Sequence, residues 1–303
     1  MRITGFNELS LLQAIINRAG DNMLGKFLDP KNDYAFKSIF GTERHQGILI
    51  HFINDMLGFH EENEVKEVSF LKTAQDPEIA SKKQSLIDVL CTDGLGRQYI
   101  IEMQVGKTAG FEKRAQYYAA KAYGKQLQQG EDYTNLKEII FIAITDFLMF
   151  PDKVNYYSTH CLLDKETNDH DLKDFSFSFL ELPKFNKKID ELTNMIEKWA
   201  YFFKYAETTK EEDLLKLVGN DTVILEAYEA LNRFHWTEVE LNTYEQEEKR
   251  ERDARSILNQ AVADGEARGE VKGEVRGIEK ERARLADKLR AKGMSEKEIQ
   301  ELL

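Results

Sequence analysis

Asp88, Glu102 and Gln104 are polar side chains set into two mostly apolar segments, residues 85–92 and 98–105. A Gly-Leu-Gly sequence between the segments predicts a β-hairpin with a three-residue turn. If the residues on either side of that turn face each other, Asp88 lies directly opposite Glu102. Side chains alternate between the two faces of a strand, so Gln104 shares a face with Glu102. A two-residue turn would shift the pairing by one residue and break this alignment.

This arrangement brings two carboxylates together. Opposed carboxylates, about 5 Å apart at Cβ, repel each other, and each raises the pKa of its neighbour. A bound divalent cation removes that cost. Mg²⁺ prefers one or two carboxylates together with waters and phosphate oxygens, so the pair fits an Mg²⁺ site at a sheet edge. The alternative from spacing alone is a solvated sheet face, with a core face on the other side formed by Ile87, Val89, Ile101 and Met103.

These residues and several further segments resemble a known family. Asp88 followed by Glu102-Met103-Gln104 is similar to the D…ExQ variant of the PD-(D/E)XK nuclease signature. More narrowly, the chain resembles the Rpn family of recombination-promoting nucleases, which are also labelled transposases. The likeness runs from about residue 27 to the C-terminus. It rests on segments that follow one another in the family's order: residues 32–41, 87–89, 101–104, 111–118 and 181–185, and then the Gly-Glu repeats.

The resemblance implies an α/β fold, with a restriction-endonuclease-like mixed sheet flanked by helices. It implies a DNA endonuclease that hydrolyses phosphodiester bonds with Mg²⁺ or Mn²⁺ and promotes DNA recombination. Asp88, Glu102 and Gln104 would be its catalytic residues, and the two acids would bind the metal. The sequence departs from the signature twice, because Ile87 replaces the proline before the first acid and Gln104 replaces the usual lysine. Gln104 can orient water or phosphate through its amide but cannot supply a positive charge.

Asp33 and Lys37 lie on the first predicted core helix, residues 33–40, which Asn32 can cap. Many relatives in the superfamily carry a further acid on this helix, and Asp33 is the candidate here for a third metal ligand. Asp33 could instead favour the helix N-terminus through the macrodipole. An i,i+4 ion pair between Asp33 and Lys37 would also explain both residues. Lys37 is in addition a candidate DNA contact.

The helix predicted over residues 111–128 carries Arg114, Tyr117, Tyr118 and Lys121 on one stripe, at i, i+3, i+4 and i+7. Arginine and lysine can hold phosphates while a tyrosine stacks on a base. Arg114, Tyr118 and Lys121 are therefore candidate DNA contacts. In the alternative interpretation both tyrosines pack on the sheet and the cations extend to water.

The order of the predicted elements indicates an α/β core followed by a helical region. We divide the chain into an N-terminal helical extension (1–26), a nuclease-like core (27–185), a helical region (186–245) and a charged tail helix (246–303). Further helices are predicted over residues 7–18, 42–57, 189–205, 211–218 and 223–233, and further strands over residues 65–71, 138–145, 156–163 and 175–182.

The tail repeats a glycine every four residues from Gly265, each of the first three followed by glutamate, and a capped final helix is predicted around Ser295. On a helix, like charges of the repeat stack at i,i+4, which is mildly destabilising. Each glycine costs about 1 kcal/mol relative to alanine. An isolated helix should therefore be marginal. We expect the tail to order by pairing with another copy, giving a homo-oligomer, or with the body; the alternative is a solvated tail.

Composition limits the partners and the compartment. The 303 residues include 42 basic and 54 acidic side chains, a net charge of −12, whereas proteins that grip DNA through bulk charge are usually basic. Cys91 and Cys161 are too few for a disulfide framework and are predicted to be buried thiols in a reducing compartment. We find no apolar segment long enough for a signal peptide or a membrane span, so we expect a cytoplasmic protein without membrane contact.

Two other functions fit parts of the sequence. A non-catalytic DNA- or protein-binding module that keeps the nuclease fold is favoured by the acidic body and by Gln104. A helical interaction protein assembled through its tail needs no chemistry at all. The opposed Asp88 and Glu102 favour the enzyme, and a retained metal site would separate the enzyme from both alternatives.

Overall fold

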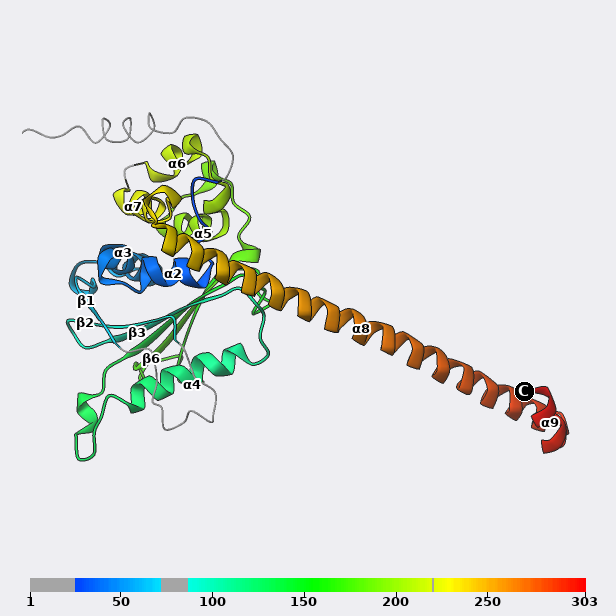
Figure 1. Cartoon of the computed structure of the whole chain (residues 1–303). Helices are drawn as coiled ribbons and strands as arrows, with labels where there is room; N and C mark the ends of the chain where they lie inside the picture. The colour runs from blue at the N-terminus through cyan, green and yellow to red at the C-terminus, as the bar shows by residue number, and fades with distance from the viewer. Residues whose placement is uncertain (1–24, 72–86, 220) are drawn as a thin grey trace, which may run out of the picture. The chain divides into compact units, whose positions relative to one another are not determined.

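The computed structural model describes residues 25–71, 87–219 and 221–303 (Figure 1). The helix predicted over residues 7–18 lies outside the described residues. The chain divides into two compact units, the first ending at Tyr244 and the second spanning Glu245–Leu303. The first unit holds the sheet and every candidate site residue.

The described part of the first unit contains a six-stranded mixed sheet. Its strands are β1 (Val68–Phe70), β2 (Val89–Asp93), β3 (Gln98–Gln104), β4 (Ile139–Thr145), β5 (Tyr157–Cys161) and β6 (Phe175–Glu181). They lie in the order β1-β2-β3-β4-β6-β5. The central strands β3, β4 and β6 run parallel, and the outer pairs are antiparallel. Every residue of β4 is buried, as expected for a parallel strand covered on both faces.

Helices cover both faces of this sheet, which confirms the predicted α/β class (Figure 1). On one face α4 (Phe111–Gly124) packs on the apolar side chains of β3, β4 and β6 that point toward it. The opposite face shares a larger core with α2, α3, α5, α6 and α7. The bounds of these helices are α2 Asp33–Phe40, α3 Gln46–Leu57, α5 Met195–Tyr205, α6 Glu211–Val218 and α7 Thr222–Ala230. Short 3-10 turns join them: η1 Glu43–His45, η2 Glu61–Asn63, η4 Tyr133–Asn135, η5 Leu182–Lys184, η6 Ile189–Glu191, η7 Ala206–Thr208 and η8 Arg233–His235.

The helix predicted over residues 42–57 begins later than expected. Thr42 does not cap it, because its hydroxyl donates back to the carbonyl of Ser38 at 2.8 Å. The turn η1 follows, and α3 starts only at Gln46. α2, in contrast, has the predicted bounds, and the side chain of Asn32 accepts from the backbone N–H groups of its first turn. The Thr42 hydroxyl is bound to the end of α2 and therefore does not cap α3.

Strand β1 is shorter than the predicted strand over residues 65–71. The backbone of Val65 is occupied by the side chain of Asn54, which accepts from the Val65 N–H at 2.8 Å and donates to its carbonyl at 2.9 Å. Asn54 is buried on α3. Because this side chain satisfies both backbone groups of Val65, the ladder with β2 begins only at Val68.

The two cysteines differ in environment. Cys91 lies in the core within β2, as predicted, and burial raises the pKa of its thiol to about 12. Cys161 ends the edge strand β5 and is exposed, so the prediction that it is buried is wrong. A strand with only one neighbour leaves its last residues in solvent.

Residues 181–185 are one of the segments on which the family resemblance rests. Here they hold the loop that follows β4. Glu181 is 1% exposed, accepts the backbone N–H groups of Met149 and Phe150, and pairs with Lys184 at 2.6 Å. Lys184 also donates to the carbonyl of Phe150 at 2.7 Å. A buried ion pair with this many partners has its desolvation offset, and it fixes the loop after β4.

The second unit is built on the tail helix. Helix α8 runs Glu238–Ala291 without interruption through the four repeat glycines, and α9 (Glu296–Leu302) follows. The capped final helix is confirmed, because Ser295 and Glu298 form a reciprocal capping box. None of the described helices is both long enough and apolar enough to cross a membrane.

Candidate active site

The hairpin has the predicted register. Val89 pairs with Ile101, and the Asp93 N–H donates across the turn to the carbonyl of Arg97 at 3.1 Å. Gly96 has φ 84°, a backbone conformation that suits glycine in this three-residue turn. Continued by one residue, the same pairing places Asp88 opposite Glu102.

Asp88 sits immediately before β2 and is tied to β3. Its Oδ2 accepts the backbone N–H of Met103 at 3.0 Å, a group that the short strand β2 leaves without a ladder partner. Its Oδ1 lies 3.4 Å from the ammonium of Lys37 on α2. The carboxylate is therefore held at the end of the sheet in a fixed orientation.

Glu102 points toward α4 and is 3% exposed, which excludes the solvated sheet face as an explanation of this residue. Its Oε2 lies 3.6 Å from the guanidinium of Arg114. Its Oε1 is buried and has no hydrogen-bond partner among the described residues. A buried carboxylate oxygen without a donor is costly, so this atom calls for a ligand.

Both acids have raised pKa values. Burial, reinforced by the charge of Asp88, raises the pKa of Glu102 to about 8, and Arg114 and Lys37 offset this only in part. Burial also raises the pKa of Asp88, against the opposing effects of Lys37 and the Met103 N–H. When both acids are ionised, their negative charge therefore exceeds what the surrounding protein compensates.

The two acids fit a divalent cation of the Mg²⁺ type. They offer hard carboxylate oxygens, one of which has no partner in the described part of the chain. Mg²⁺ commonly takes one or two carboxylates and completes its shell with waters and phosphate oxygens. Within residues 25–71, 87–219 and 221–303, no group of three or more acidic, histidine or cysteine side chains could hold one metal ion. Asp33 is paired with Lys37 in this structure, and its role as a third metal ligand stays a prediction.

Lys37 bridges two acids. Its ammonium lies 2.6 Å from Asp33 Oδ1, as in the predicted i,i+4 ion pair, and 3.4 Å from Asp88 Oδ1. Burial lowers the pKa of Lys37, but the hydrogen bond and charge of Asp33 and the charge of Asp88 outweigh it, so the pKa is raised. Lys37 is thus held as a cation beside the acid pair.

Gln104 positions Arg114. Its amide nitrogen donates to the carbonyl of Gly106 at 2.9 Å, and its amide oxygen accepts from the Arg114 guanidinium. The guanidinium also stacks over the ring of Phe111, 4.7 Å from its centroid. The sequence identified both residues but not their contact, because nothing in the spacing shows that α4 begins beside the end of β3.

The comparison with protein families identifies the architecture that carries this site. Residues 30–261 match the model of a family described as PD-(D/E)XK nuclease family transposase. The chain belongs to this family. No curated protein and no solved structure matches the chain significantly.

In this PD-(D/E)XK chain, the stripe on α4 is only partly accessible. Tyr118 is 7% exposed and belongs to the core between α4 and the sheet, so its ring offers no face to a base, and its prediction as a DNA contact is corrected. Tyr117 is 55% exposed, and the Lys121 ammonium lies 5.9 Å from its ring centroid. The accessible side of the stripe therefore consists of the exposed Tyr117, with Arg114 and Lys121 partly buried on either side of it.

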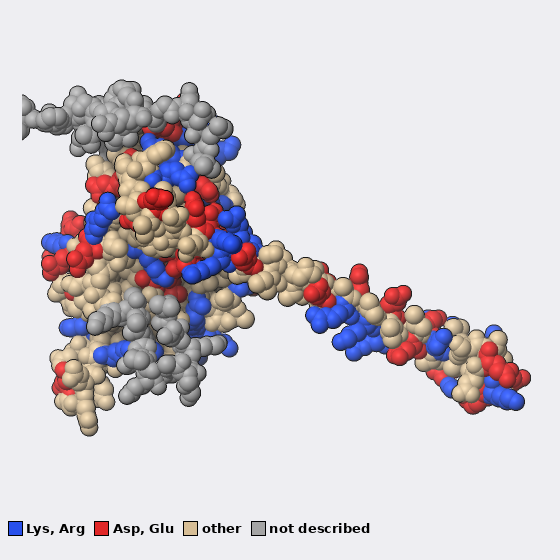
Figure 2. All heavy atoms as spheres, viewed as in Figure 1, with Lys and Arg blue, Asp and Glu red and all other residues tan. Residues whose placement is uncertain are grey.

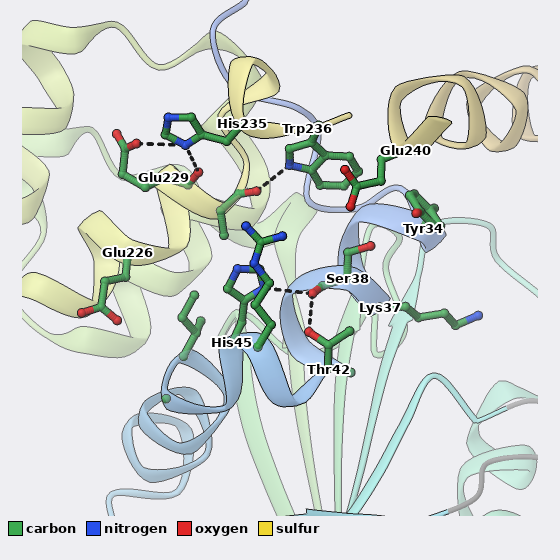
Figure 3. Close-up of a pocket in the computed structure, with 15 residues that line it drawn as sticks. Tyr34, Lys37, Ser38, Thr42, His45, Glu226, Glu229, His235, Trp236 and Glu240 are labelled. Atoms are coloured by element: carbon green, nitrogen blue, oxygen red, sulfur yellow. Dashed lines mark hydrogen bonds and ion pairs between the residues drawn. The ribbon is translucent and has the colours of Figure 1, made fainter. Parts of the chain in front are cut away.

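A cavity of about 730 Å³ lies between α2, α3, α7 and the start of α8 (Figure 3). Of the candidate site residues only Lys37 lines it, and Figure 3 shows this side chain extending away from His45 and His235. The walls carry both signs of charge, with Glu229 close to His235 at 3.5 Å. The acid pair is thus separate from this cavity.

The raised pKa of Glu102 predicts how the metal-free protein responds to pH. Its folded-state pKa of about 8 exceeds the ordinary value of 4.5, so the folded state binds more protons than the unfolded state between these values. Stability conferred by the protonated form is present at low pH and is lost as pH rises toward 8. Between pH 5 and 9 in EDTA, the wild type should lose on the order of 4 kcal/mol relative to Glu102→Gln.

Urea unfolding of both proteins at several pH values measures this difference, with Glu226→Gln on the exposed side of α7 as the matched control. The control should follow the wild type. Identical pH dependence of wild type and Glu102→Gln would contradict the burial of an ionisable Glu102.

Proposed function

We propose that this protein is a divalent-metal-dependent DNA endonuclease whose cuts promote DNA recombination, with Asp88 and Glu102 as the metal ligands. The observation that carries the proposal is the opposed acid pair of a half-buried Asp88 and a buried Glu102, whose Oε1 has no partner among the described residues, in a chain of a nuclease family. DNA is the substrate that this family membership favours, and Mg²⁺ or Mn²⁺ is the metal that the oxygen ligands favour.

A bound Mg²⁺ would lower the pKa of a coordinated water and neutralise charge on the scissile phosphate. The protein's own residues have separate tasks. Asp88, fixed by the Met103 N–H, presents its other oxygen to the site. Lys37 places a positive charge beside this acid from α2, and so takes over the charge stabilisation that Gln104 cannot provide.

Arg114 is the second cation at the site. It lies between Gln104 and Glu102, and its Nε is buried without a partner in the described part of the chain. A guanidinium with unused donors beside an acid pair suits a phosphate oxygen of the DNA strand. In this proposal Gln104 acts on the substrate through Arg114. Asp33 acts through Lys37, and metal binding by Asp33 stays a prediction.

The alternative is a DNA- or protein-binding module that retains the fold without catalysis. Its support is the net charge of −12, and Figure 2 shows Lys and Arg interspersed with Asp and Glu rather than one continuous basic surface on the face drawn. A nuclease needs only a local contact with its substrate, so the net charge does not exclude the enzyme. The acid pair therefore favours the enzyme.

Nicking of supercoiled plasmid tests the proposal. Purified wild-type protein is incubated with plasmid and Mg²⁺, with Mn²⁺, or with EDTA, and the conversion to open-circular DNA is followed over time. We expect cleavage with either metal and none in EDTA. Cleavage unaffected by EDTA would contradict metal dependence, and no cleavage by folded protein with either metal would favour the binding module.

Tyr117 is predicted to contribute to DNA affinity, because an exposed tyrosine beside Lys121 can stack on a base. Tyr117→Ala should weaken binding of a single-stranded oligonucleotide about fivefold, the equivalent of about 1 kcal/mol, without lowering the melting temperature. Tyr118→Ala is the matched comparison. It should lower the melting temperature because it opens a cavity in the core, with Tyr118→Phe close to wild type in both measurements.

Fluorescence anisotropy with a labelled oligonucleotide gives the affinities, and thermal unfolding gives the stabilities. Unchanged affinity in Tyr117→Ala would remove this residue from the DNA contact surface.

A further inference from the structure

The tail helix α8 carries an apolar seam with heptad spacing. In the register that makes Val275 position a, positions a and d between residues 254 and 289 are apolar except at Asp264, Arg268 and Arg282. A repeat of this length is the pattern of a coiled coil. The apolar members of the seam are Ala254, Ile257, Ala261, Val271, Val275, Ile278, Leu285 and Leu289.

These side chains lie open in a single copy of the chain. Ile257 is 71% exposed and Val271 is 62% exposed. Two further apolar residues, Leu258 and Val262, flank the seam at positions e and b. An exposed apolar stripe along a helix is stabilised when a second helix covers it.

The repeat glycines avoid the seam. Gly265, Gly269, Gly273 and Gly277 fall at positions e, b, f and c, since a four-residue repeat moves around a seven-residue one. Each glycine weakens an isolated helix by about 1 kcal/mol relative to alanine. Contacts of the seam with a partner helix would offset this cost, and the glycines lie outside the seam where those contacts form.

The charged seam residues decide the orientation of the partner. In a parallel, in-register pair each core residue meets its own copy, so Asp264 would face Asp264 and Arg268 would face Arg268. Like charges in direct contact oppose that arrangement. In an antiparallel pair position a faces position d, and Asp264 of each chain can face Arg268 of the other. Two reciprocal ion pairs then replace two contacts between like charges.

The same antiparallel register matches side chains by size. Ala261 falls opposite Val271, Ile257 opposite Val275, and Ala254 opposite Ile278, in two symmetric copies. Small residues opposite larger ones fill a coiled-coil core without overpacking. Beyond Ile278 the register would bring Arg282 against Arg250 of the second copy, so the paired segment ends there.

Asp264 and Arg268 are available for such contacts. Arg268 Nε donates to the backbone carbonyl of Asp264 at 3.0 Å, and the Asp264 carboxylate accepts from Gln260 at 2.8 Å. Neither side chain forms an ion pair within the residues that the structure describes.

We propose that residues 254–278 of two chains form an antiparallel coiled coil, centred on reciprocal Asp264–Arg268 ion pairs. This dimer goes beyond the proposed nuclease function and does not depend on it. The partner in this proposal is a second copy of the same chain.

Charge reversal in the full-length protein tests the pairing. By sedimentation equilibrium the wild type should reach twice the 35.1 kDa chain mass. Arg268→Asp and Asp264→Arg should each weaken dimerisation about tenfold or more, and the double swap Asp264→Arg/Arg268→Asp should recover wild-type affinity within about threefold. A wild type that stays monomeric, or a double swap as weak as the single variants, would overturn the proposal.

Cysteine cross-linking tests the orientation in a Cys161→Ser background. Under mild oxidation an equimolar mixture of Ile257→Cys and Val275→Cys proteins should form a disulfide-linked dimer, whereas neither should do so alone. Val262→Cys, which lies off the seam, is the matched control mixed with either protein. Cross-linking of Ile257→Cys with itself would indicate a parallel pair and refute the antiparallel one.

Discussion

We expect Glu102→Gln to slow Mg²⁺-dependent plasmid nicking about 1000-fold or more, because losing one of two metal carboxylates removes about 4 kcal/mol of charge stabilisation. Glutamine keeps the size of the side chain and leaves a polar amide beside the Arg114 guanidinium, which lies 3.6 Å from Glu102 Oε2 in the wild type. The variant therefore removes the charge and leaves the packing under α4 intact. Quantified conversion of supercoiled to open-circular plasmid measures the loss.

A second property separates this loss from misfolding. In EDTA above pH 8 the inactive Glu102→Gln protein should be more stable than the active wild type, because it no longer buries an ionised carboxylate. It should also lose the stabilisation that added Mg²⁺ gives the wild type. Full activity in a folded Glu102→Gln protein would exclude Glu102 as a metal ligand.

Asp88→Asn should give a similar loss of activity. Its amide oxygen can still accept the Met103 N–H, so the connection to β3 is preserved while the charge facing Lys37 is lost. Glu226→Gln, on the exposed side of α7, is the control for the loss of any carboxylate and should nick at the wild-type rate.

The placement of Asp88 opposite Glu102 could be predicted from the sequence because the turn between β2 and β3 sets the pairing of the two strands. Gly-Leu-Gly sets a three-residue connection, and the register between β2 and β3 then follows residue by residue to Asp88 and Glu102. The family resemblance, which rested on segments in order rather than on one motif, is confirmed for residues 30–261.

The contacts made across the fold did not follow from the sequence. Periodicity shows that α4 has a stripe but not which edge of the stripe meets the sheet, so it does not distinguish Tyr118, which packs in the core, from the exposed Tyr117. Burial of Glu102 requires α4 to lie over this end of β3. The approach of Lys37 to Asp88 joins α2 to the residue before β2, and no local pattern encodes so distant a contact.

Lys37→Met is expected to slow nicking about 100-fold, the usual effect of removing one preorganised group that stabilises transition-state charge. Methionine retains an unbranched side chain, so the packing of α2 is largely kept. Lys37→Arg should retain most activity, because it restores the cation at this position. Asp33→Asn should have an intermediate effect, since Asp33 holds the Lys37 ammonium at 2.6 Å.

Metal binding distinguishes a catalytic charge from a structural one. Lys37 offsets part of the negative charge of Asp88 and Glu102, so Lys37→Met should bind Mg²⁺ at least as tightly as the wild type, measured as Mg²⁺-induced stabilisation. Slow nicking with undiminished metal binding would place the effect of Lys37 on the phosphate. Loss of both would mean that Lys37 merely organises the acids, and wild-type nicking by Lys37→Met would refute its role. Gln104 is neutral, and its amide already contacts Gly106 and Arg114. Lys37 is therefore expected to act on the phosphate, which predicts slow nicking with undiminished metal binding.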